Sequence, residues 1–190
     1  MFVEFLKSLN WVDILMILLV IRIVFIGVKT GFVIEFFKLI GTIAAVFITL
    51  HYYVVFAKLF TQFQLKFVSM PIAQLIAFVL LWVAVIVVAK FVREGLLLLL
   101  KVEANNILNT WVGGLLSILR AVLVCSLVFI ALYLPRIDYF QQNCDNSFSH
   151  PYLYEVAPNA YKGVYDGVVS KVFPQEKLNE SIYKIKSGKI

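Results

Sequence analysis

Five charged residues fall within long apolar stretches of the chain, and their chemistry most needs explaining. They are Asp13, Arg22, Glu35, Lys38 and Arg120. A charged side chain at the centre of a membrane-spanning helix costs about 2.5–3.5 kcal/mol on insertion scales, so each of these needs a partner or water. A deep carboxylate with access to water is also what a proton-coupled transporter requires. These five residues are therefore the first candidates for a functional role.

The spacing of these charges predicts which of them form pairs. Asp13 and Arg22 are nine residues apart, which places them on opposite faces of a helix. Arg22 and Glu35 each lie about 10 Å from a turn near residue 29, at 1.5 Å per residue. We therefore expect Glu35 within salt-bridge distance of Arg22 or Arg120, with Lys38 sharing it from one turn away. The alternative is that Arg22 and Lys38 extend their charged ends to the membrane surface.

Small residues lie beside these charges. A row of small residues at intervals of four flanks Arg120 and consists of Gly113, Ser117, Ala121 and Cys125. A second pair, Gly27 and Gly31, lies near the first turn. Small residues at this spacing let two helices approach closely. We expect the row to face another helix. Packing alone is the simpler interpretation; the alternative is that the row presents Arg120 to a carboxylate or a lipid phosphate.

Motifs typical of enzymes are missing from the sequence. It contains no H-E-x-x-H, no G-x-S-x-G and no glycine-rich phosphate loop. His51 and His150 have no nucleophile at a recognisable spacing, and Cys125 and Cys144 have neither metal-ligand spacing nor a disulfide framework. We expect no catalysis, no cofactor, no metal and no pairing of the two cysteines.

The composition identifies the elements that carry these residues. The 190 residues are 62% hydrophobic and 15% charged, with a net charge of +6, which is too apolar for a soluble domain. Four segments are long enough to span a bilayer: 11–28, 32–52, 71–91 and 111–134. The fold class is therefore an all-α, four-helix transmembrane bundle over residues 1–134. Because the first two segments are nearly adjacent, they are expected to form a tight antiparallel hairpin.

Two further segments are expected outside the spans. The link over residues 93–110 contains five consecutive leucines and predicts a short helix in the membrane interface. Residues 135–190 form a polar tail, in which apolar positions between 161 and 173 follow one face of a helix. That helix would rest on the membrane surface, lie under its own bundle or dock on a partner. The excess of cations favours anionic lipid headgroups over nucleic acid as a partner.

Three stretches resemble a known family. They are W-V-D at residues 11–13, G-F-V-I-E at 31–35 and N-T-W-V-G-G-L-L-S-I-L-R-A at 109–121. Together they resemble the colicin V production protein (CvpA) family. In its D-x-x-x-G-x-x-x-G-x-x-R-G motif Gly113 and Arg120 match, while Asn109 replaces the aspartate and Ser117 and Ala121 replace glycines. A weaker likeness continues around Ser147 and Pro151 in the tail.

The resemblance implies a small four-span protein of the bacterial inner membrane, linked to toxin biosynthesis or export and to envelope robustness. It implies no known reaction. Its partners would be the lipid bilayer and either a second copy or a membrane component of the export machinery, with no nucleic acid. The alternative function is a small ion- or solute-transporting membrane protein.

Overall fold

Four long helices form the body of the protein in the computed structural model, which describes residues 9–62, 69–99 and 107–185. They are α2 (Trp11–Thr30), α3 (Phe32–Gln62), α4 (Met70–Leu99) and α5 (Ile107–Tyr133). Each is long and apolar enough to cross a membrane. The described residues contain helices and no strand, so the all-α, four-span prediction is confirmed.

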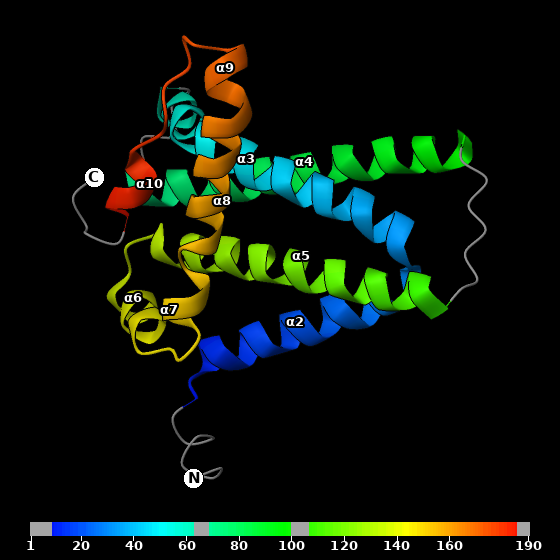
Figure 1. The fold of residues 1–190 in the computed structure, drawn as a ribbon. Helices are drawn as coiled ribbons and strands as arrows, with labels where there is room; N and C mark the ends of the chain where they lie inside the picture. The colour runs from blue at the N-terminus through cyan, green and yellow to red at the C-terminus, as the bar shows by residue number, and fades with distance from the viewer. Residues whose placement is uncertain (1–8, 63–68, 100–106, 186–190) are drawn as a thin grey trace.

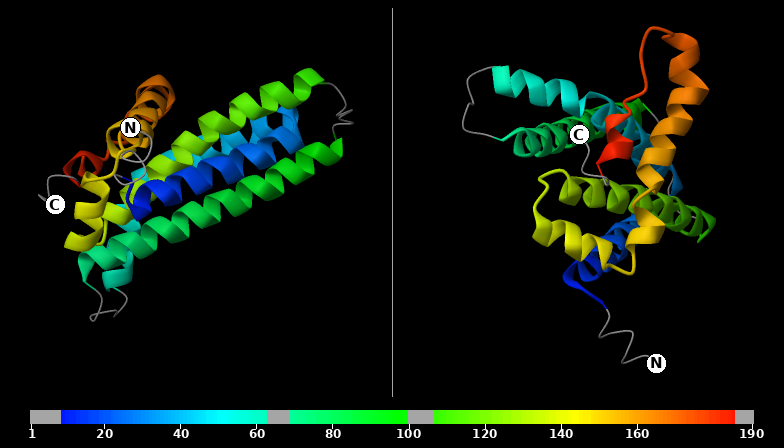
Figure 2. Two further views of the ribbon diagram at one scale, coloured as in Figure 1. Left: turned by 90° about the horizontal axis from the view of Figure 1, so that it is seen from below. Right: turned by 90° about the vertical axis from the view of Figure 1, so that its left-hand side faces the viewer.

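The four helices pack side by side in the order α4, α3, α5, α2 (Figures 1 and 2). The predicted hairpin of α2 and α3 is wrong: Gly31 alone joins them, but they diverge and α5 packs along both. The physical reason is that the small residues at the end of α2 face α5, which approaches more closely there than α3 does. As a result α2 and α4 occupy the two edges of the arrangement.

The helices also extend beyond the predicted spans. α3 continues ten residues past Tyr52, and α4 continues through residues 93–99. The separate interfacial helix expected in the link is therefore wrong for the described residues, because this leucine-rich stretch simply prolongs α4. Residues 100–106 of that prediction lie outside the described part of the chain.

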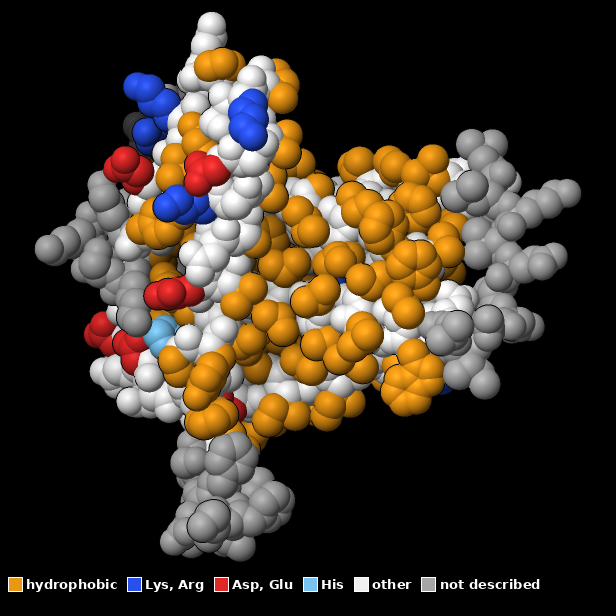
Figure 3. All heavy atoms as spheres, in the orientation of Figure 1, with side chains coloured by type: hydrophobic (Ala, Val, Ile, Leu, Met, Phe, Trp, Pro, Cys, Tyr) orange, Lys and Arg blue, Asp and Glu red, His pale blue; other side chains and the backbone are white. Residues whose placement is uncertain are grey.

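The outward faces of the long helices form an almost continuous hydrophobic surface (Figure 3). Its most exposed large side chains include Leu18, Ile21 and Phe25 on α2, Val88, Phe91 and Val92 on α4, and Leu115 and Leu119 on α5. Exposed apolar area on this scale is typical of a lipid-facing or partner-facing surface. The charged side chains visible in Figure 3 gather mainly at the end formed by the tail.

The tail folds over one end of the long helices (Figure 1). It contains α6 (Asp138–Asp145), α7 (His150–Leu153), α8 (Val156–Val164), a π-helical turn η1 (Tyr165–Val169), α9 (Ser170–Val172) and α10 (Ser181–Lys184). The helix expected from the 161–173 pattern is present but begins at Val156, because Pro158 is tolerated in a first turn. Its Tyr161 is fully buried, whereas Val168, Val172 and Phe173 are exposed. Only the first half of this helix therefore packs under its own bundle.

Candidate functional site

Glu35 is the centre of the intramembrane polar cluster. Its side chain is fully buried one turn into α3. The Arg120 Nη2 atom lies 2.9 Å from Glu35 Oε2, and the Lys38 Nζ atom lies 2.5 Å from Oε1. The Thr30 hydroxyl donates a hydrogen bond of 2.7 Å to Oε1. Glu35 therefore ties together the end of α2, the start of α3 and the middle of α5.

The two cations of this cluster are themselves largely withdrawn from the surface. The Arg120 and Lys38 side chains are 16% and 15% exposed. With one carboxylate between them, the cluster has an excess of one positive charge. Arg120 meets Glu35 as an ion pair without an aligned hydrogen bond, and its buried Nε has no hydrogen-bond partner among the described residues. One donor of the guanidinium is thus unused by the protein.

A close crossing of α2 and α5 positions this cluster. A Cβ atom on Gly27 would lie 2.2 Å from Ser117 Cβ, and one on Gly113 would lie 2.7 Å from the Gly31 carbonyl carbon. Ser117 and Ala121 are fully buried. Gly113 and Ser117 therefore face α2, and the close approach holds the next turn of α5 against Glu35.

Asn109 fixes the turn between α2 and α3. Gly31 has a φ of 78°, in a region that favours glycine. The backbone N–H of Phe32 donates a 2.6 Å hydrogen bond to Asn109 Oδ1, which satisfies one of the free donors at the start of α3. Where the family motif has aspartate, an amide oxygen supplies the acceptor here. This role needs no negative charge.

Arg22 does not join the cluster. It is exposed on α2 and makes no ion pair with any residue that the structure describes. Of the two partners expected for Glu35, the structure selects Arg120, because Arg22 lies on an exposed face of α2 whereas Arg120 on α5 points to the carboxylate. Lys38 binds Glu35 and does not extend to the membrane surface, so that alternative is wrong for Lys38.

Asp13 lies apart from the cluster and binds the tail. Its carboxylate is buried and accepts hydrogen bonds from the hydroxyls of Ser147 and Ser149, at 2.7 and 2.6 Å. The backbone N–H groups of Phe148, Ser149 and Asn10 donate to it as well. Sequence reasoning missed this role. Two features of the sequence indicate a structural role for Asp13. Asn10 lies three residues before it, which is the pattern of a capping box, and the residues around Ser147 resemble the family.

We expect Asp13→Ala to loosen the tail. The substitution removes the acceptor from five donors, and leaving buried donors unpaired costs about 1–3 kcal/mol. Thermal unfolding in detergent and limited proteolysis of the tail would measure the effect. Asp138→Ala is the matched control, because Asp138 is exposed in the tail. Equal stability and equal cleavage of the two variants would contradict the assigned role.

A second contact holds the tail on α3. His51 Nδ1 and Nε2 lie 2.9 Å from the Tyr161 hydroxyl and 3.2 Å from Glu176 Oε2. The Asn179 side chain donates a 2.7 Å hydrogen bond to the Leu50 carbonyl. Burial raises the pKa of Tyr161 to about 12, so its hydroxyl stays neutral in this network. His51 is thus used to join the tail to the bundle.

The two cysteines are free and buried, so the prediction that they do not pair is confirmed. Burial, with a smaller contribution from Asp145, raises the pKa of Cys144 to about 12. Thiolate is the reactive form, so we expect very slow maleimide labelling of the folded protein at neutral pH and rapid labelling after denaturation. Asn159→Cys, at an exposed position, is the positive control. Fast labelling of the native cysteines in the folded protein would contradict their burial.

Comparison with known proteins identifies the family of the chain. The family model described as "Colicin V production protein" matches residues 12–158. This region contains the four long helices, the Glu35 cluster and the contact between Asp13 and the tail. A search of curated proteins and a search of solved structures gave no match.

Proposed function

Because the chain belongs to the colicin V production protein family, we propose that it supports the production or export of a colicin V-type peptide toxin and the robustness of the cell envelope. It does so as a multi-pass protein of the bacterial inner membrane, through helix contacts and without catalysis of its own. The family match is the observation that carries this proposal, because it spans the membrane helices and the contact with the tail.

The use made of the two buried acids supports a non-catalytic role. Glu35 is held by two cations and a hydroxyl, and Asp13 accepts hydrogen bonds from three backbone and two side-chain donors. A general acid or base must reach the proton that it transfers on a substrate. Both carboxylates instead join elements of the fold, which favours a structural use of the charges.

The arrangement of the helices supports a role through membrane partners. The edge helices α2 and α4 each have one principal neighbour, and α4 exposes most of its apolar side chains. A partner helix packing on α4 gains close dispersion contacts in place of lipid. We propose that this edge receives either a second copy of the chain or a membrane component of the export machinery.

A small ion or solute transporter is the second candidate function. The observation that favours it is the buried intramembrane Glu35 with two cations, a combination found in substrate and proton pathways. Flux assays on the purified protein in liposomes separate the candidates. The proposed function predicts no flux above that of empty liposomes, whereas flux that is lost in Glu35→Gln would support the transporter.

Toxin export from cells lacking the chain tests the proposed function. We expect a toxin-producing strain without the protein to release at least about tenfold less active toxin, and the wild-type chain on a plasmid to restore release. Toxin activity in the medium and in lysed cells, measured in parallel, separates production from export. Undiminished toxin in both fractions without the chain would contradict the proposal.

A further inference from the structure

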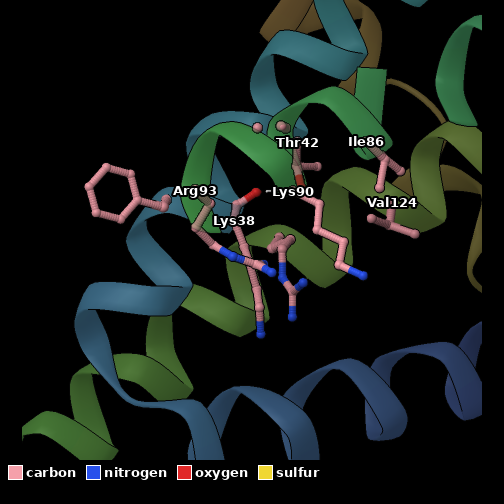
Figure 4. A pocket seen from close by; sticks show the side chains of 10 residues that line it. Lys38, Thr42, Ile86, Lys90, Arg93 and Val124 are labelled. Carbon is pink, nitrogen blue, oxygen red and sulfur yellow. Dashed lines mark hydrogen bonds between the residues drawn. The ribbon is translucent and has the colours of Figure 1, made fainter. Parts of the chain in front are cut away.

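A cationic hollow opens beside the Glu35 cluster, between α3, α4 and α5. Four basic residues line it, Lys38, Lys90, Arg93 and Arg120, together with Thr42 and apolar side chains such as Phe37, Ile86 and Val124. Its volume is about 200 Å³, and none of the described residues that line it is acidic. In Figure 4 the side chains of Lys38 and Arg93 extend toward the same side of the helices, whereas that of Lys90 points away from them.

The protein does not neutralise this hollow. Glu35, which does not line the hollow, pairs with Lys38 and Arg120. The half-exposed Glu94 lies 3.6 Å from the Arg93 guanidinium and 3.9 Å from the Lys90 amine. Among the described residues, four cations thus face two carboxylates, which leaves two positive charges in excess. Uncompensated charge in the membrane region is costly, so an anion in the hollow would stabilise the fold.

Two arginines offer the donors that such an anion needs. Arg120 lines the hollow and pairs with Glu35 through its Nη2 atom, while its Nε has no hydrogen-bond partner among the described residues. Arg93 is only 19% exposed, and its 3.6 Å contact with Glu94 is too long for a hydrogen bond. Planar guanidinium groups bind phosphate oxygens through two parallel N–H donors. The pair is therefore suited to a phosphate group.

The surroundings point to a phosphate carried by a lipid. Lys38 is six residues from the start of α3 and Arg93 six from the end of α4, or about 9 Å along each helix. Arg120 lies deeper, in the middle of α5, so a headgroup bound here would reach inward from this end of the bundle. An apolar groove of about 340 Å³ shares Phe37, Gly41, Ala89 and Arg93 with the hollow and continues along Ile40, Ala44, Val88 and Val92. Such a groove suits an acyl chain.

We propose that the hollow binds the phosphate of an anionic phospholipid, with Arg93 and Arg120 as its principal donors and an acyl chain in the adjoining groove. The bound phosphate neutralises the excess charge. It also bridges α4 and α5, which make few direct contacts with each other. The inference is independent of the role in toxin export.

Binding of defined lipids to the purified, delipidated full chain tests this site. The probes are dioleoyl phosphatidylglycerol, the zwitterionic dioleoyl phosphatidylcholine and inorganic phosphate, each titrated in detergent with native mass spectrometry and thermal stability as readouts. We expect one phosphatidylglycerol to bind and raise the melting temperature, with Arg93→Gln weakening that binding roughly tenfold, the loss of one charge-assisted contact. Arg93→Lys, which keeps the charge, should retain more binding than Arg93→Gln.

Lys29→Gln is the matched control. It removes a charge from the same end of the bundle, where Lys29 lies over the Phe25 ring outside the hollow, and it should bind phosphatidylglycerol like the wild type. If inorganic phosphate binds in an Arg93-dependent way and the lipids do not, the hollow is a phosphate site, and the claim that a lipid carries the phosphate is wrong. Equal binding of both lipids, or equal loss in Arg93→Gln and Lys29→Gln with helix content unchanged, would overturn the proposal.

Discussion

Replacing Glu35 with glutamine is expected to destabilise the protein by about 3–5 kcal/mol, the cost of removing one partner from a buried ion pair. The amide keeps the shape of the side chain, so the loss reports charge and not packing. Arg120 and Lys38 would remain largely buried without their counter-ion. Unfolding of the purified protein in mixed micelles, followed by circular dichroism, measures the change.

Glu94→Gln is the control for this prediction. Glu94 also lies near two cations at the same end of the bundle, but its side chain is 50% exposed and its contacts are long. Surface pairs of this kind contribute about 0–1 kcal/mol. If Glu35→Gln cost no more than Glu94→Gln, Glu35 would not be the buried centre of the cluster.

Replacing Ser117 with leucine is expected to separate α2 from α5. The Ser117 side chain packs against the backbone of Gly27. A Cβ atom added to Gly27 would lie 2.2 Å from the Cβ atom of Ser117. A leucine at position 117 has no space there, and overpacking typically costs about 1–3 kcal/mol and sometimes more. Here both helix backbones must move, so we expect about 3 kcal/mol or more and poor accumulation in membranes.

Leu115→Phe tests whether this effect depends on the helix face. Leu115 is on the same helix and 63% exposed, so an added ring should meet lipid and change stability by less than about 0.5 kcal/mol. Membrane yield and melting temperature of the two variants are compared directly. Unchanged values for Ser117→Leu would show that the small row is incidental to the packing.

The sequence carries clear information on the spans, and it narrows the partner of Glu35 to Arg22 or Arg120. Runs of about 20 apolar residues have few alternatives to a membrane helix, and depth along the helices brings Arg120 level with Glu35. The four-residue spacing of Gly113, Ser117 and Ala121 places them on one face by helix geometry alone. The spans and the small row use only positions within one helix, and the pairing of Glu35 uses only depth along each helix.

The remaining features depend on how the helices are arranged in space. The divergence of α2 and α3 follows from the packing of α5 on Gly27 and Gly31. The spacing of small residues along the chain does not show which helix packs against them. The bond between Asp13 and Ser147 joins residues 134 positions apart. The sequence places Arg93 in the link after the third span, and Arg93 enters the cationic hollow because α4 continues past that expected span.

A double-mutant cycle on Glu35 and Arg120 tests the central claim, that an intramembrane ion pair ties α3 to α5. The free energy of unfolding is measured for the wild type, Glu35→Gln, Arg120→Gln and the double variant under one set of conditions. We predict that the double variant is less destabilised than the sum of the single variants by at least about 1.5 kcal/mol, as for close charge pairs. Additivity within about 0.5 kcal/mol, as found for independent sites, would contradict it.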